Sequence, residues 1–141
     1  MRNVLFRGKC VGDDDVYGWV DGYYVCLRDS YKKRESHRIY TGFAECDCGN
    51  FYGDWYEVDP ETVGQFTGLT DKNGNRIFEG DILVRHITPM IVTYSEESAS
   101  FIVKYNIDNR PFTNTLDGHD YLKVVGNIHD NPELMEKDTF L

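Results

Sequence analysis

The sequence predicts a mostly β protein, and three observations support this prediction. Apolar residues recur at every second position or in short β-branched and aromatic runs. Gly, Asn and Asp interrupt these runs every several residues, as turns do. Hydrophobic residues make up 40% of the 141 residues and aromatic residues 14%, which indicates a packed core. We expect one domain over residues 1–141, with a β-rich N-terminal lobe at 1–63 and a small antiparallel, SH3-like or OB-like barrel at 64–141.

The N-terminal lobe begins with three predicted strands. They cover residues 4–11, 16–20 and 23–27. The acidic turn at residues 12–15 joins the first two strands. The Asp21-Gly22 pair predicts a tight hairpin between the second and third, because both central residues of a type I′ turn need positive φ.

Residues 28–53 show no clear pattern. They mix a charge-rich segment with two short aromatic stretches, and we interpret them as a variable excursion. Its basic cluster, Lys32, Lys33 and Arg34, is most simply a solvated loop face. Edge strands in this excursion would allow copies of the chain to pair, and the sequence does not predict how many would join.

A short helical turn is predicted after the excursion. Asp59 can cap it, Pro60 suits the first helical position because no N–H is needed there, and Glu61 faces the positive end of the helix dipole. Gly64 can end the turn in a left-handed conformation. A strand follows over residues 65–69.

The C-terminal half contains four further predicted strands. They cover residues 82–87, 90–94, 100–105 and 121–128. Connections of a few residues make neighbouring strands antiparallel, and about five strands around one core favour a small barrel. The sequence Asn131-Pro132-Glu133 predicts a last helical turn.

The stretch TDKNGNRIFEGD at residues 70–81 has oxygen-bearing side chains at alternate positions, as a calcium-binding loop does. Asp71, Asn73 and Asn75 match the first three ligand positions of an EF-hand. Arg76 stands where the loop needs glycine, and Ile82 where it needs a bidentate Glu. Because Asn-Gly between two strand-like segments is a strong hairpin signal, we interpret this stretch as a turn.

Three segments together resemble a known family. They are the run WYEVDPETVGQFTGLTDKNG at 55–74 with its continuation at 77–82, the opening FRGK at 6–9, and the closing VGNIHDNPEL at 125–134. In this order they resemble the YopX family of bacteriophage and prophage proteins. The resemblance implies a mostly β fold with an SH3-like C-terminal part, a phage or prophage origin, and no established activity or catalytic residues. Residues 45–48 fall outside the shared motifs.

The charge balance bears on the class of partner. Fifteen Lys and Arg against 24 Asp and Glu give a net charge of −9, which disfavours nonspecific binding to nucleic acid or anionic lipid.

We find no signal-peptide core and no apolar run that would span a membrane, so we expect a protein of the bacterial cytoplasm. Its four cysteines, Cys10, Cys26, Cys46 and Cys48, are then expected to be reduced thiols.

Two further sets of residues offer metal ligands. Cys46 and Cys48, together with Cys26, Cys10 and His37, offer zinc ligands, but the spacing of structural zinc motifs is missing. The run at residues 13–15 offers three carboxylates for magnesium, but two-metal chemistry needs carboxylates from separate elements. We therefore expect no metal and no cofactor, and interpret these residues as thiols and a solvated turn.

The chain also lacks the common signatures of enzymes. It contains no phosphate-binding glycine pattern, no His-Glu-x-x-His and no nucleophile elbow. We therefore expect that the protein is not an enzyme and that it has no catalytic residue.

Aromatic residues gathered in the first half form the candidate interaction surface. They are Tyr23, Tyr24, Tyr52, Trp55 and Tyr56. We expect a non-catalytic module that binds a host or phage protein through these rings. The alternatives are cross-strand pairs that only stabilise the sheet, a barrel that binds nucleic acid by stacking, and an acidic protein that mimics DNA.

Overall fold

The computed structural model of the chain describes residues 4–31, 33–117 and 119–136. The fold is mostly β: a six-stranded and a five-stranded antiparallel sheet, with short 3-10 segments between strands. The chain divides into two compact units, Met1–Gln65 and Phe66–Leu141, and each is described by itself. In the described part of the chain, no helix has the length and hydropathy needed to cross a membrane.

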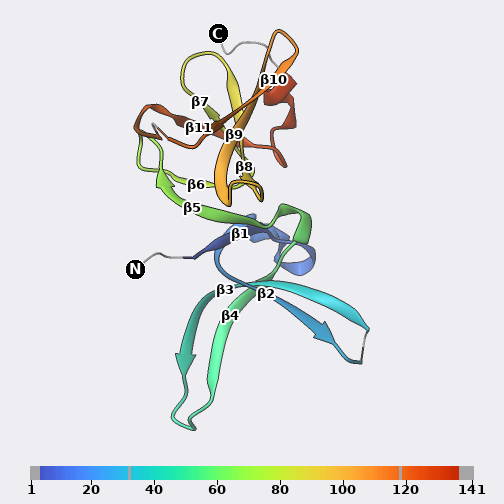
Figure 1. Cartoon of the computed structure of the whole chain (residues 1–141). Helices are drawn as coiled ribbons and strands as arrows, with labels where there is room; N and C mark the ends of the chain where they lie inside the picture. The colour runs from blue at the N-terminus through green and yellow to red at the C-terminus, as the bar shows by residue number, and fades with distance from the viewer. Residues whose placement is uncertain (1–3, 32, 118, 137–141) are drawn as a thin grey trace. The chain divides into compact units, whose positions relative to one another are not determined.

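The N-terminal unit is built from antiparallel strands, of which β2 and β3 are the longest. They are β1 (Phe6–Lys9), β2 (Trp19–Asp29), β3 (Arg34–Glu45), β4 (Phe51–Glu57) and the start of β5 (Gly64–Thr70). The hydrogen-bonded order of the six-stranded sheet is β4-β3-β2-β1-β5-β6. Figure 1 shows β2 with β3, and β3 with β4, as two ribbons that share β3.

The core of this unit lies on one face of the strands. Cys10, Ile39 and Val58 are buried, and further apolar side chains pack around them, namely Phe6, Val20, Tyr24, Tyr56 and Val63. Tyr24 and Ile39 are directly opposite each other on β2 and β3, so alternate residues of both strands point to the core. Burying a side chain as completely as Ile39 stabilises the fold by roughly 2–3 kcal/mol.

The predicted hairpin at Asp21-Gly22 is wrong, because β2 runs through both residues. Its first part pairs with β1 and its second part with β3. Gly22 is needed for a different reason: a Cβ at this position would lie 2.2 Å from the carbonyl oxygen of Tyr40. The glycine allows a close approach of two backbones within a continuous strand.

The structure also corrects the predicted boundaries before and after β2. Residues 16 and 17, predicted to begin a strand, belong to the 3-10 segment η1 (Gly12–Tyr17).

The excursion at 28–53 is mainly the two strands of a long hairpin, β3 and β4. Its alternation was hidden because several residues on both faces of this ribbon are polar. In the basic cluster, Lys33 is a turn residue with φ of 51°, Arg34 begins β3, and Lys32 lies outside the described residues.

The predicted helical turn after residue 59 is confirmed as the 3-10 segment η2 (Pro60–Thr62). The side chain of Asp59 accepts a hydrogen bond of 3.0 Å from the backbone N–H of Glu61, as a capping residue does. The predicted role of Gly64 is wrong. The turn ends in extended backbone at Val63, and Gly64 begins β5.

The C-terminal unit holds the second sheet. Its strands are β6 (Arg76–Phe78), which pairs with β5, and β7 (Asp81–Val84), β8 (Pro89–Ser95), β9 (Ser100–Ile107), β10 (Arg110–Thr115) and β11 (Lys123–Asn127). The 3-10 segments are η3 (His119–Tyr121) and η4 (Pro132–Glu136), and η4 confirms the predicted last helical turn. All four strands predicted in this half are present, whereas β6 and β10 were missed.

The predicted barrel is not observed. The five-stranded order β10-β9-β8-β7-β11 has two ends, and no closed barrel forms among the described residues. Its core is one apolar cluster contributed by strands and loops, namely Ile77, Leu83, Val92, Val103, Leu116 and Leu122. An open sheet therefore buries one continuous cluster without closing on itself.

Candidate interaction surface

Aromatic residues form a row across three strands of the N-terminal unit. In the register of the sheet, Tyr23 on β2 is opposite Tyr40 on β3, and Tyr40 is opposite Trp55 on β4. Side chains of directly opposite residues point to the same face. This face is the reverse of the one that carries Tyr24 and Ile39 to the core.

A β-bulge in β3 brings a further ring into this row. The register shifts between Tyr40 and Gly42, so Thr41 is an extra residue without its own partner on β4. Tyr40 and Phe43 are three residues apart, yet their rings stack with centroids 5.2 Å apart and planes 9° from parallel. Phe43 also contacts Tyr23, with ring centroids 5.8 Å apart.

Gly53 makes room for these rings. It lies opposite Phe43 on β4, and a Cβ there would be 2.8 Å from both the Tyr40 ring and the carbonyl oxygen of Gly42. Separations this short do not occur for real Cβ atoms. The two rings can therefore lie over β4 because position 53 carries no side chain.

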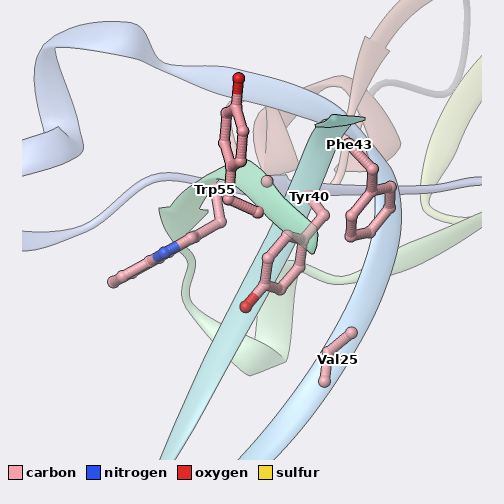
Figure 2. A pocket seen from close by; sticks show the side chains of 6 residues that line it. Val25, Tyr40, Phe43 and Trp55 are labelled. Atoms are coloured by element: carbon pink, nitrogen blue, oxygen red, sulfur yellow. The ribbon is translucent and has the colours of Figure 1, made fainter. Parts of the chain in front are cut away.

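The row surrounds an open pocket of about 470 Å³. Its lining comes from all three strands: Val25, Tyr40, Phe43, Tyr52, Gly53 and Trp55. Figure 2 shows Tyr40 and Phe43 beside each other, with Val25 and Trp55 from the flanking strands. The exposed fractions of Phe43, Tyr52 and Trp55 are 58%, 59% and 41%, so large apolar area faces solvent here.

Arg38 lies against this surface. Its guanidinium carbon is 3.7 Å from the centre of the Trp55 ring, which is a close cation–π contact. The Nε of Arg38 donates a hydrogen bond of 3.0 Å to the Ser36 hydroxyl, which holds the guanidinium in place. Trp55 is therefore fixed in orientation while part of its ring remains exposed.

Comparison with protein families identifies the chain. A family model described as YopX protein matches residues 17–136. The chain belongs to the YopX family. This confirms the resemblance found in the sequence motifs.

One solved structure similar to this YopX-family protein is that of protein EF1440 from Enterococcus faecalis. The two share 27% sequence identity, with 96% of this chain and 99% of that chain covered, and the TM-score is 0.49. A search of the curated proteins gives no match to this chain.

The structure separates the five aromatic residues predicted for the interaction surface of this YopX-family protein. Tyr52 and Trp55 line the pocket, and Tyr23 borders it through Phe43. Tyr24 and Tyr56 lie on the opposite face and pack against the core. To make this distinction from the sequence, one would need to know which residues within 34–57 lie opposite each other in the two strands.

The same lack of a pairing explains which residues the sequence analysis missed. These are Val25, Tyr40, Phe43 and Gly53. For Tyr40 and Phe43 the signal was the alternation within residues 34–45, which we interpreted as part of the excursion. Val25 lies in the predicted strand at 23–27, and Gly53 lies in β4. The bulge at Thr41 would still have obscured the relation between Tyr40 and Phe43.

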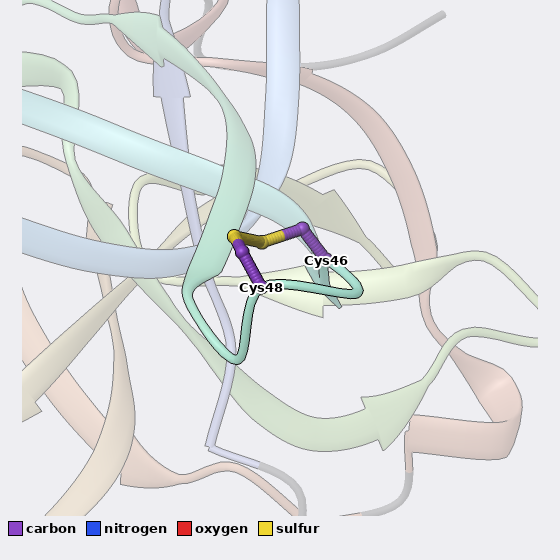
Figure 3. The surroundings of a disulfide bond; sticks show 2 residues. All are labelled: Cys46 and Cys48. Carbon is purple, nitrogen blue, oxygen red and sulfur yellow. A yellow bond between two sulfur atoms is a disulfide. The ribbon is translucent and has the colours of Figure 1, made fainter.

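The expectation of four thiols in this YopX-family protein is wrong for two cysteines. Cys46 and Cys48 form a disulfide across the turn between β3 and β4, with Cα atoms 5.2 Å apart (Figure 3). The turn allows this because backbone hydrogen bonds between Cys46 and residues 49 and 50 bring the two sulfurs together. Cys10 and Cys26 are free, Cys10 buried and Cys26 exposed. Burial and the nearby Asp14 carboxylate raise the pKa of the Cys10 thiol.

The stretch considered as a calcium loop is a turn, as predicted. Both oxygens of the Asp71 carboxylate accept hydrogen bonds: Oδ1 from the backbone N–H groups of Asn73 and Asn75, Oδ2 from the Asn75 amide and the N–H of Val124. Burial alone would raise the pKa of this carboxyl, but the hydrogen bonds outweigh it and the pKa is lowered. The carboxylate is thus engaged in holding the turn.

The acidic run at residues 13–15 lies within the single 3-10 segment η1. The Oδ2 of Asp14 accepts a hydrogen bond of 3.2 Å from the backbone N–H of Glu57. This carboxylate fixes η1 to the end of β4. Asp13 and Asp15 are exposed, in line with the interpretation of this run as a solvated turn, whereas Asp14 is half-buried.

Proposed function

We propose that this YopX-family protein is a non-catalytic module of phage or prophage origin that binds another protein in the bacterial cytoplasm. The observation that carries the proposal is the exposed aromatic pocket on β2, β3 and β4. Tyr, Trp and Arg are the residue types that contribute most at protein interfaces. Here Tyr52 and Trp55 line the pocket, and the guanidinium of Arg38 lies over the Trp55 ring.

The pocket is ordered before a partner arrives. Tyr40 is stacked on Phe43, and Trp55 is held by Arg38. Fixing a side chain at an interface costs about 0.5–1.5 kcal/mol of conformational entropy. Because the fold has already restricted these rings, the free-energy cost of ordering them when a partner binds is smaller.

The position of β4 favours an extended segment as the bound element. β4 is at one end of the hydrogen-bonded order of its sheet, next to the pocket residues Tyr52 and Trp55. An extended peptide that pairs with an edge strand gains main-chain hydrogen bonds, and side-chain pockets beside the edge give specificity. A partner strand along the first residues of β4 would bring its side chains to the aromatic rings.

Nucleic acid is the competing ligand, because exposed aromatic rings also stack bases. The net charge of −9 opposes this, since binding to a phosphate backbone depends on basic residues. The guanidinium of Arg38 is already over Trp55. We therefore rank a protein partner first.

The test is affinity capture from lysate of a bacterial host, with and without nuclease, read by mass spectrometry. The immobilised wild-type chain is compared with Trp55→Ala and with Tyr31→Ala, a matched control because Tyr31 is 99% exposed in the turn between β2 and β3. A protein retained in both nuclease conditions, lost with Trp55→Ala and kept with Tyr31→Ala, supports the proposal. Loss on nuclease treatment would favour nucleic acid, and equal retention by Trp55→Ala would contradict a role of the pocket.

A further inference from the structure

A cluster of metal-binding side chains lies on the reverse face of the β2–β3 ribbon, away from the aromatic pocket. Cys26 on β2 is directly opposite His37 on β3. Glu35 precedes His37 by two residues, so its side chain points to the same face. The antiparallel register thus brings together a thiol, an imidazole and a carboxylate from two strands.

The distances suit a single ion. One ligand atom from each of Cys26, Glu35 and His37 lies within 4.8 Å of the other two. The Nε2 of His37 and the Oε2 of Glu35 are 3.7 Å apart. Two ligands of one tetrahedral zinc ion are about 3.5 Å apart, given bond lengths of about 2.0–2.3 Å. Rotation of the exposed side chains of Cys26 and Glu35 closes the remaining gap.

His37 is held in the orientation that such a site requires. Its Nδ1 is 2.6 Å from the hydroxyl of Tyr24, and the two rings are nearly parallel, 7° apart. Its backbone carbonyl accepts a hydrogen bond of 2.9 Å from the N–H of Val58. If Nδ1 donates its proton to Tyr24, the lone pair of Nε2 is available to a metal, which is the usual arrangement around metal-ligating histidines.

We propose that Cys26, Glu35 and His37 bind one divalent transition-metal ion, with Zn²⁺ as the best match. Sulfur, imidazole and carboxylate ligands together suit zinc and disfavour Ca²⁺ and Mg²⁺, which take oxygen ligands. Three protein ligands leave a fourth position for water or for a side chain of a bound partner. The ion can reach the site without opening the fold, because Cys26 is exposed and the Glu35 side chain is 64% exposed.

The site differs from the zinc set considered from the sequence. Of that set, only Cys26 and His37 meet, Cys10 is buried in the core, and Cys46 and Cys48 are bonded to each other. Glu35 was not considered. The test must therefore separate the ribbon site from the pair at the β3–β4 turn.

The experiment titrates the tag-free full chain, kept reduced by a phosphine, with Zn²⁺ by calorimetry and with Co²⁺ by absorption spectroscopy. We expect one ion per chain and a near-ultraviolet charge-transfer band from a Co²⁺–thiolate bond. Cys26→Ser should abolish this band, and His37→Gln and Glu35→Gln should weaken binding at least tenfold. Tyr24→Phe, which removes only the hydroxyl at Nδ1, should weaken it about tenfold.

Two control variants make the result specific. The double variant Cys46→Ser/Cys48→Ser should bind as the parent chain does, and so should His86→Gln, which changes an exposed histidine of the other unit. Absence of Zn²⁺ binding by the parent chain would overturn the proposal. Binding that survives Cys26→Ser but is lost in the double variant would also overturn it. These readouts require no protein partner, so they are independent of the proposed function.

Discussion

The carboxylate of Asp71 accepts a hydrogen bond of 3.0 Å from the backbone N–H of Val124, 53 residues further along the chain. The same carboxylate holds the turn between β5 and β6 through Asn73 and Asn75. Asp71 is only 4% exposed. One buried side chain thus fixes a local turn and ties it to β11, the last strand of the second sheet.

Replacement of this carboxylate should destabilise the C-terminal unit. Asp71→Asn keeps the size of the side chain but places an NH₂ group where one oxygen accepts backbone hydrogen bonds. We expect a loss of roughly 1.5–3 kcal/mol, the usual range for hydrogen bonds to a charged group. Hydrogen exchange of the Val124 amide should become faster by about tenfold or more, because 1.4 kcal/mol corresponds to a factor of ten. Asp117→Asn, at an exposed position in the same unit, should leave it unchanged.

The stability of this unit should also fall in acid because of Asp71. Its pKa in the folded chain is below the ordinary value of 3.8. The stabilisation is therefore fully present above that value and is lost as the pH falls through the lower pKa of the folded state. Urea unfolding followed by NMR signals of the C-terminal unit should show a decline below pH about 4. The decline should be shallower in Asp71→Asn, and an equal slope in both chains would contradict the assignment.

The aromatic pocket should be sensitive to a single methyl group at position 53. Gly53→Ala places a Cβ against the Tyr40 ring and the Gly42 carbonyl, so the strands or the rings must move. We expect a cost of about 1–3 kcal/mol and altered NMR shifts of the Tyr40 and Phe43 rings. Gly42→Ala is the matched control, because a Cβ there meets nothing within 4 Å. Equal effects of the two substitutions would show that the pocket does not depend on the space at residue 53.

The hydroxyl of Thr62 should stabilise the N-terminal unit. It donates a hydrogen bond of 2.6 Å to the carbonyl of Asp59 and accepts one of 2.9 Å from the backbone N–H of Lys9. Thr62→Val keeps the shape but removes both, and we expect a loss of roughly 1–3 kcal/mol in urea unfolding followed by tryptophan fluorescence. Both tryptophans, Trp19 and Trp55, lie in this unit. Thr113→Val, at an exposed position, should cost little.

The strands that could be predicted from sequence are those that bury one face. β8 and β9 carry Val92 and Val103 into the core of their unit, and their apolar residues therefore stand out from the polar ones. β10 was missed because all its residues are exposed and it contains Pro111. Its hairpin signal was the pair Asp108-Asn109, both with positive φ.

The candidate sites could be predicted only in part, because they depend on which residues are opposite each other. The sequence grouped Trp55 with Tyr56, yet neighbours in a strand point to opposite faces, and only Trp55 lines the pocket. Cys26 and His37 were both considered as zinc ligands without a register that joins them. Their pairing follows from the β2–β3 turn, which the sequence analysis placed inside the variable excursion at 28–53.

The bulge at Thr41 means that the pocket depends on chain length as well as on residue type. In a regular strand, residues 40 and 43 would point to opposite faces, and the extra residue is what places both rings together. Deleting Thr41 would send one ring to the other side while leaving every aromatic residue in the sequence. In an alignment of YopX proteins, a one-residue gap in β3 would therefore say more about whether the pocket exists than substitution of either ring.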